Sequence, residues 1–185
     1  KWLTPRLVTD STYKTTETIG QYLVSGFVMG KIGTTVIKSE VVYGENLTHL
    51  LMIGGYGMKT PETPIVDNDY EYTSLKTLSS WIDIQHYFGK TSIGLFAGYS
   101  KLYGANDNYT SLEISKVKYY RNDDINYIYR LSPRISYKQE NITLAFEYML
   151  TAAIYGKTFD DKRNVETSMD PVYNNRITFA AKYDF

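Results

Sequence analysis

Three basic residues of this chain are spaced to act together on an anion. Arg130, Arg134 and Lys138 lie four residues apart, so in an extended strand they project from one face. On a lipid-facing surface near the bilayer midplane each would cost about 2–4 kcal/mol, so the row must face water. Such a row draws anions along a wetted wall. The alternative is that the cations pair with Glu147 and its neighbours across strands and keep the wall hydrated and stiff.

Other charged residues fall in the same phase of nearby alternating segments. Near the basic row the count leans basic, because five cations stand against two carboxylates. We therefore expect a wall that favours anions. The further basic candidates are Arg176, Lys182 and Lys38, and the acidic candidates are Glu40, Asp83, Glu147 and Asp184.

Groups suited to catalysis or metal binding are sparse. The chain has no cysteine, which excludes disulfides, thiolate metal sites and a cysteine nucleophile. His49 and His86 fall in different segments, and no nucleophile elbow, phosphate loop or His-x-x-x-His pair occurs. Loop acid pairs such as Asp123 with Asp124 lack calcium-loop spacing and suggest solvated loops. We expect no catalytic residue, metal or cofactor; an enzyme using loop residues such as His49 and Asp67 is the least favoured alternative.

The composition indicates how these side chains are positioned. The 185 residues suit one domain, and the balance of 20 basic and 20 acidic residues gives no field that would favour nucleic acid. The 19 tyrosines suit a surface that is apolar on one side and wet on the other. No segment approaches the roughly 18 apolar residues of a membrane-spanning helix. A chain that spans lipid without helices must form a closed barrel.

Alternation of apolar and polar residues with a period of two predicts an antiparallel all-β fold. The pattern predicts seven strands. Bacterial single-chain barrels have even numbers of strands, and seven is odd. We therefore expect further strands, preceding Lys1, in a larger barrel. The expected strands cover about 18–30, 32–44, 72–88, 91–104, 119–138, 141–156 and 172–185.

The connections alternate between short and long, as in outer-membrane barrels with periplasmic turns and extracellular loops. Short turns are expected near Gly30-Lys31, Gly89-Lys90 and Gln139-Asn141. This places the end of the last strand on the periplasmic side. The expected extracellular loops cover about 45–72, 104–123 and 157–172.

The apolar stretch 45–58 fits a short helix stopped by glycine, or an additional strand. An additional strand would put a long loop on the periplasmic side, so we assign the stretch to an extracellular loop. Its apolar residues must then be covered, by folding into the barrel mouth or at a subunit contact.

Aromatic residues near the expected strand ends fit the interfacial girdles of membrane proteins. Stacking platforms for sugars or bases are the alternative. The girdle residues would be Tyr87, Phe88, Tyr137 and Tyr183 on the periplasmic side, and Tyr43, Tyr103, Tyr127, Tyr155 and Tyr173 on the outer side.

The last segment resembles the closing strand of bacterial outer-membrane proteins. Its apolar phase carries Ile177, Phe179, Tyr183 and the aromatic Phe185. The resemblance implies that these four residues form the signal read by the barrel-assembly machinery.

A wider resemblance, over about residues 30–185, is to Bacteroidetes-type trimeric porins of the DcaP-like group. It implies a barrel of perhaps sixteen strands, a homotrimer in the bacterial outer membrane in contact with lipid and lipopolysaccharide, and passive diffusion of small, often anionic solutes. A plugged barrel serving as a binding or structural subunit, and a soluble β-sandwich or lipocalin-like fold, are the alternatives. The strings that carry the resemblance are ENLT at 45–48, LLMIGGY at 50–56, WID at 81–83 and GLFAGY at 94–99 before Gly104.

Overall fold

A computed structural model describes residues 2–5, 8–9, 13–14, 17–60, 71–110 and 120–185. Two short pairs lie near the N-terminus: β1 (Trp2–Leu3) with β4 (Ile19–Gly20), and β2 (Val8–Thr9) with β3 (Tyr13–Lys14). One large sheet contains the remaining strands. Its long members are β5 (Leu23–Ile32), β6 (Thr35–Glu45), β8 (Tyr72–Phe88), β9 (Thr91–Ala105), β12 (Ile125–Gln139), β13 (Ile142–Phe159) and β15 (Val172–Tyr183).

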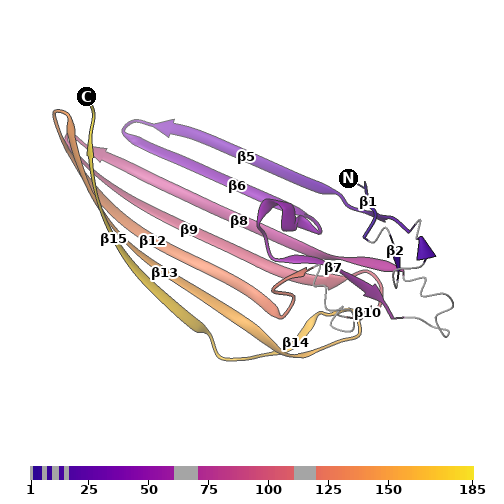
Figure 1. The fold of residues 1–185 in the computed structure, drawn as a ribbon. Helices are drawn as coiled ribbons and strands as arrows, with labels where there is room; N and C mark the ends of the chain where they lie inside the picture. The colour runs from indigo at the N-terminus through magenta and orange to yellow at the C-terminus, as the bar shows by residue number, and fades with distance from the viewer. Residues whose placement is uncertain (1, 6–7, 10–12, 15–16, 61–70, 111–119) are drawn as a thin grey trace.

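The long strands form an antiparallel meander in the order β5-β6-β8-β9-β12-β13-β15. Figure 1 shows them side by side in a curved sheet. The predicted antiparallel all-β fold is confirmed. Within the described residues β5 pairs only with β6, and β15 only with β13, so the sheet is open at both edges.

Short turns gather at one end of the sheet, together with the C-terminus (Figure 1); we call this the turn end. The predicted turns at Gly89-Lys90 and Gln139-Asn141 are confirmed. The turn predicted at Gly30-Lys31 is wrong, because both residues lie inside β5, opposite Ile37 and Val36. The chain reverses instead at Gly33, whose φ of 58° is favourable for glycine.

The stretch 45–58, predicted to be loop, is largely ordered into two elements. The 3-10 helix η1 (Leu47–Leu50) is followed by β7 (Gly54–Lys59). Glu45 of β6 pairs with Lys76, and Gly55 of β7 pairs with Leu75. Since β6 and β7 occupy successive stretches of one edge of β8, they form a single interrupted line, and the order of long strands is unchanged.

A small hydrophobic core lies at the opposite end, which we call the loop end. Leu47 is 1% exposed, and Ile53 packs on the sheet, where its carbonyl accepts a 2.8 Å hydrogen bond from the Thr77 hydroxyl. Leu50 and Leu51 stay 48% and 74% exposed. Part of the apolar stretch is thus covered by folding onto the sheet. The core consists of Ile53, Leu75, Leu102, Ala105, Tyr109 and Ile125.

The other two predicted loops also contain strands. In the segment after β9, β10 (Tyr109–Thr110) and β11 (Tyr120–Arg121) both pair with β7. After β13, which continues to Phe159, β14 (Val165–Ser168) folds back on its end. The loop end is therefore built of short paired strands that the polar composition of these segments does not predict.

Candidate functional site

The charged candidates lie on one face of the sheet, which we call the polar face. Residues paired directly across neighbouring strands project to the same side. Lys38 pairs with Asp83, and Arg134 with Glu147. The remaining register extends this face from β6 to β15, so that it also carries Glu40, Arg130, Lys138, Arg176 and Lys182.

The opposite face, which we call the apolar face, exposes large hydrophobic side chains over the same strands. Ala145 and Phe146 show the division, because these adjacent residues of β13 point to the polar and the apolar face respectively. Each of the following residues of the apolar face is between 41% and 69% exposed: Ile93, Leu95, Leu131, Ile135, Leu144, Phe146, Ile177 and Phe179.

The residues predicted as an assembly signal lie at this apolar face and the end of β15. Ile177, Phe179 and Tyr183 are 69%, 68% and 55% exposed. Phe185 lies just past the strand, and its ring centroid is 5.0 Å from that of Tyr183 in an edge-to-face contact. These side chains are accessible; their recognition by an assembly factor stays a prediction.

An ion pair at the centre of the polar face joins β8 to β12 across the intervening strand β9. The Arg134 guanidinium donates to the Asp83 carboxylate at 2.6 Å. To reach it, the arginine lies over Gly94 of β9, where an added Cβ would come within 2.7 Å of its Nε. Glycine at this position therefore permits the pair, and Arg134 is neutralised by Asp83 rather than by its directly paired neighbour Glu147.

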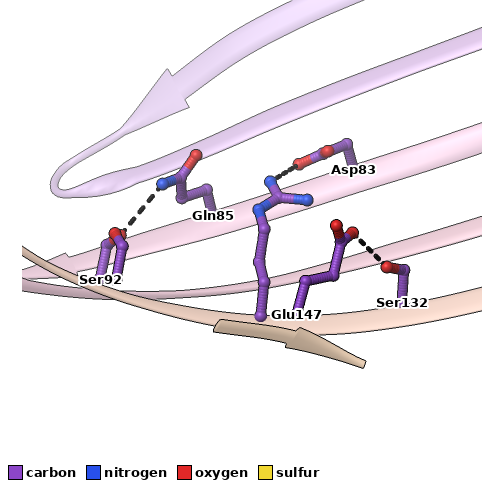
Figure 2. A network of polar contacts seen from close by, with 7 residues as sticks. Asp83, Gln85, Ser92, Ser132 and Glu147 are labelled. Carbon is purple, nitrogen blue, oxygen red and sulfur yellow. Dashed lines mark hydrogen bonds and ion pairs between the residues drawn. The ribbon is translucent and has the colours of Figure 1, made fainter. Parts of the chain in front are cut away.

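Hydrogen bonds also join polar side chains around this pair (Figure 2). Glu147 accepts a hydrogen bond from the buried Ser132. Gln85 donates to Ser92 at 3.1 Å, and Ser92 is 2.7 Å from Ser136. The polar face thus carries three separate groups of polar contacts, which together span β8, β9, β12 and β13.

Three cations of the polar face have no acidic partner among the described residues. Among the residues that the structure describes, Lys38, Arg130 and Arg176 form no ion pair. Arg130 donates to the Thr151 hydroxyl at 3.1 Å. These three are the candidates that present uncompensated positive charge.

A separate charged group lies at the turn end. Asp184, which follows β15, is 2.6 Å from the Lys182 amine and 4.0 Å from that of Lys138. Both cations are exposed, so these pairs contribute little to stability. Asp184 is the one charged candidate outside the long strands, and it contacts Lys182 and Lys138 at the ends of two of them.

Sequence reasoning missed a group of aromatic rings on the polar face. Phe27, Trp81 and Phe96 come from β5, β8 and β9, and their rings are neighbours. The available signal was the phase of Trp81, which alternates with Ile82 and shares the face of Asp83. Two of the girdle predictions are wrong: Tyr155 packs against the core at the loop end, and Tyr87 pairs with Ser92 on the polar face.

The loop acids are more structured than predicted. Asp123 is 3% exposed, although we expected a solvated loop; its carboxylate is 3.3 Å from Arg163 and accepts a hydrogen bond from Tyr109 at 3.3 Å. Asp160 accepts from the backbone of Asn164 at 2.7 Å. Asp67, proposed as a partner for His49, lies outside the described residues. The Asp123 contacts link the β9–β12 and β13–β14 connections.

Acidification is expected to tighten this link. Burial raises the pKa of Asp123, the Arg163 guanidinium opposes this, and the Asp124 carboxylate raises the pKa further. A carboxyl with a raised pKa binds its proton more readily in the closed loop, so closure is favoured as pH falls and is weakened as pH rises through the raised value. Hydrogen exchange, corrected for intrinsic rates, should show stronger protection of the Ala105 and Tyr109 amides, which donate to Lys162 and Asp161, at mildly acidic pH than at neutral pH.

The variant Asp123→Asn is the control for this expectation. It keeps the size of the side chain but cannot titrate, so protection of the same two amides should no longer depend on pH. Protection that falls on acidification in the unmodified protein would contradict the assignment.

Within the described residues, no helix has the length and hydrophobicity to cross a lipid bilayer. Comparisons with protein-family models, with curated proteins and with solved structures find no match to this chain.

Proposed function

We propose that this sheet is part of the wall of a transmembrane β-barrel in the bacterial outer membrane, and that the barrel is a porin for passive diffusion of small solutes. One observation carries the proposal: six adjacent long strands, from β6 to β15, divide into an exposed apolar face and a charged face. Exposed apolar surface of this extent marks an interaction surface, and alternation across a lipid boundary is the pattern of membrane barrels.

The dimensions and edges of the sheet support this proposal. The long strands have 10 to 18 residues, which meets or exceeds the roughly 9–11 residues of a tilted strand that crosses a bilayer. Among the described strands, the edges at β5 and β15 leave backbone groups unpaired, which is too costly in hydrocarbon. We therefore propose that further strands close the sheet into a larger, even-stranded barrel.

The proposed orientation follows the connections. The turn end is periplasmic and the loop end extracellular, since outer-membrane barrels keep their short turns on the periplasmic side. By the resemblance to DcaP-like porins, we also propose a homotrimer that contacts lipid and lipopolysaccharide and is inserted by the barrel-assembly machinery. No catalytic step or cofactor is part of the proposal.

The charges of the polar face support the proposal that the channel passes small solutes with a preference for anions. In the part of the chain that the structure describes, Lys38, Arg130 and Arg176 present positive charge without an acidic partner, whereas Arg134 is neutralised by Asp83. Charged side chains that line a pore raise the local concentration of ions of opposite sign.

A second candidate is a plugged or narrow barrel that serves as a binding or structural subunit. The observation that favours it is the core at the loop end, where Ile53, Leu75 and Leu102 pack together. Leu75 and Leu102 belong to the phase of the polar face, so this core narrows the space above that face.

Reconstitution of the purified protein into planar lipid bilayers tests the proposal. We expect stable stepwise conductance, and dispersion only in the presence of detergent. A protein that stays monodisperse in detergent-free buffer would rule out the membrane location. Inserted protein without conductance would favour the plugged barrel.

A further inference from the structure

Three aromatic rings form a strip on the polar face, where an ordinary hydrated wall has polar or small side chains. The centroids of Phe27 and Trp81 are 6.2 Å apart, and those of Trp81 and Phe96 are 6.0 Å apart with planes 26° from parallel. Phe27 is 60% exposed. We call these three residues the aromatic strip.

Local packing holds the strip in place. The Trp81 indole N–H donates to Oε2 of Glu40 at 2.9 Å, which fixes the ring across β6. Phe96 lies over Gly98, where an added Cβ would be 3.0 Å from its ring. The absence of a side chain at Gly98 therefore lets Phe96 lie beside Trp81 near the surface of the sheet.

Hydrogen-bond acceptors and hydrogen-bond donors surround the strip. Glu40 accepts the Trp81 N–H with Oε2, and within the described residues no hydrogen bond or ion pair occupies its Oε1. Arg130 lies in the same cross-strand row as Trp81, separated from it by Gly98 of β9. Lys38 and the Asp83–Arg134 pair lie in adjoining rows. A ligand over the rings would therefore meet both hydrogen-bond acceptors and donors.

We propose that the aromatic strip is a binding track for saccharides. One face of a pyranose ring presents C–H groups, which suit the electron-rich face of an aromatic ring. Its edge presents hydroxyls, which donate to Glu40 and accept from Arg130. An uncharged ligand rich in hydroxyls matches a site that combines flat apolar rings with donors and acceptors. The inference rests on the proposed function, since it names a substrate class for the same wall.

The direction of the strip suits passage along the wall. It runs across the strands, from β5 to β9. Barrel strands tilt by roughly 35–45° from the barrel axis, so a row perpendicular to them also climbs the wall. A sugar that moves from ring to ring would therefore advance through the channel.

Tryptophan fluorescence tests the track without relying on conductance. The chain has only two tryptophans, so Trp2→Phe leaves Trp81 as the sole indole. The protein is kept in an amine-oxide detergent, whose headgroup carries no sugar, and is titrated with maltotriose. We expect a saturable change in emission, and no change with sorbitol, a linear polyol without a ring face. An unchanged emission with maltotriose would overturn the proposal, as would a response to benzoate alone, which would indicate an aromatic-anion site.

Conductance block then measures the contribution of the rings. Maltotriose should reduce the current in a concentration-dependent manner, and Trp81→Ala should raise the half-blocking concentration by about threefold to tenfold, the range for losing one aromatic contact. Trp81→Phe should restore most of the block, and Phe146→Ala, on the apolar face, should leave it unchanged. Conductance that is insensitive to maltotriose would overturn the saccharide track but not the channel. A fluorescence response without conductance would support the track and contradict the channel.

Discussion

Replacing Arg130 and Arg176 by glutamate should change a channel that prefers anions into one that prefers cations. Neither arginine forms an ion pair among the described residues, so the double variant changes the net charge of the wall by four units. A wall charge about 8 Å from a passing ion contributes roughly 0.5 kcal/mol in water. After screening by salt, four units correspond to a change of about tenfold in the anion-to-cation permeability ratio. The reversal potential in a salt gradient measures this ratio.

The Asp83–Arg134 pair provides the matched control. Asp83→Asn combined with Arg134→Gln removes two charges of opposite sign that lie 2.6 Å apart. Since the net charge stays the same, the permeability ratio should change little, although the same face is altered. A ratio that is unaffected by the glutamate variant, or affected equally by both variants, would contradict the assignment of selectivity to the unpaired cations.

Placing a charge on the apolar face should strongly destabilise the protein in lipid. Phe146 is 44% exposed and lies between Ile135 and Phe179 on the neighbouring strands. If this face contacts hydrocarbon, Phe146→Arg should lower the free energy of unfolding by about 2–4 kcal/mol, the cost of arginine near the bilayer midplane. Denaturant unfolding in phospholipid vesicles, followed by tryptophan fluorescence, measures the change.

The adjacent residue supplies the control for this substitution. Ala145 points to the polar face, between Ser136 and Ala180, where a guanidinium would meet water. Ala145→Arg should therefore cost much less than Phe146→Arg, although the same side chain enters the same strand. Equal costs at the two positions would show that the two faces share one solvent and would contradict the membrane proposal.

Much of the strand pattern could be predicted because alternation is a local property. Each apolar or polar side chain fixes its own phase, so β8 was predicted with the observed bounds, Tyr72–Phe88. Local periodicity does not fix the turn positions in the same way. The chain 18–32 is apolar in both phases, so the sequence predicts the reversal at Gly30, whereas it occurs at Gly33. Only the positive φ of Gly33 distinguishes the two glycines.

The candidate site could be predicted only in part, because contacts between strands depend on register. The basic row identified Arg130 and Arg134 from their spacing, but Arg134 and Asp83 are 51 residues apart. Their pairing depends on the register of β8, β9 and β12 and on the missing side chain at Gly94. The aromatic strip was missed for the same reason, since its three rings come from three strands.

The sequence by itself determined that the basic row shares one face of a strand in an antiparallel all-β fold, because a period of two assigns every residue of a strand to one of two faces. The tertiary structure decided which of those cations are neutralised, and that the apolar residues Leu47 and Ile53 fold inward at the loop end. It also decided that the edges at β5 and β15 are unpaired within the described residues. These features depend on partners distant in the chain, whose positions follow from strand register and turn geometry rather than from local periodicity.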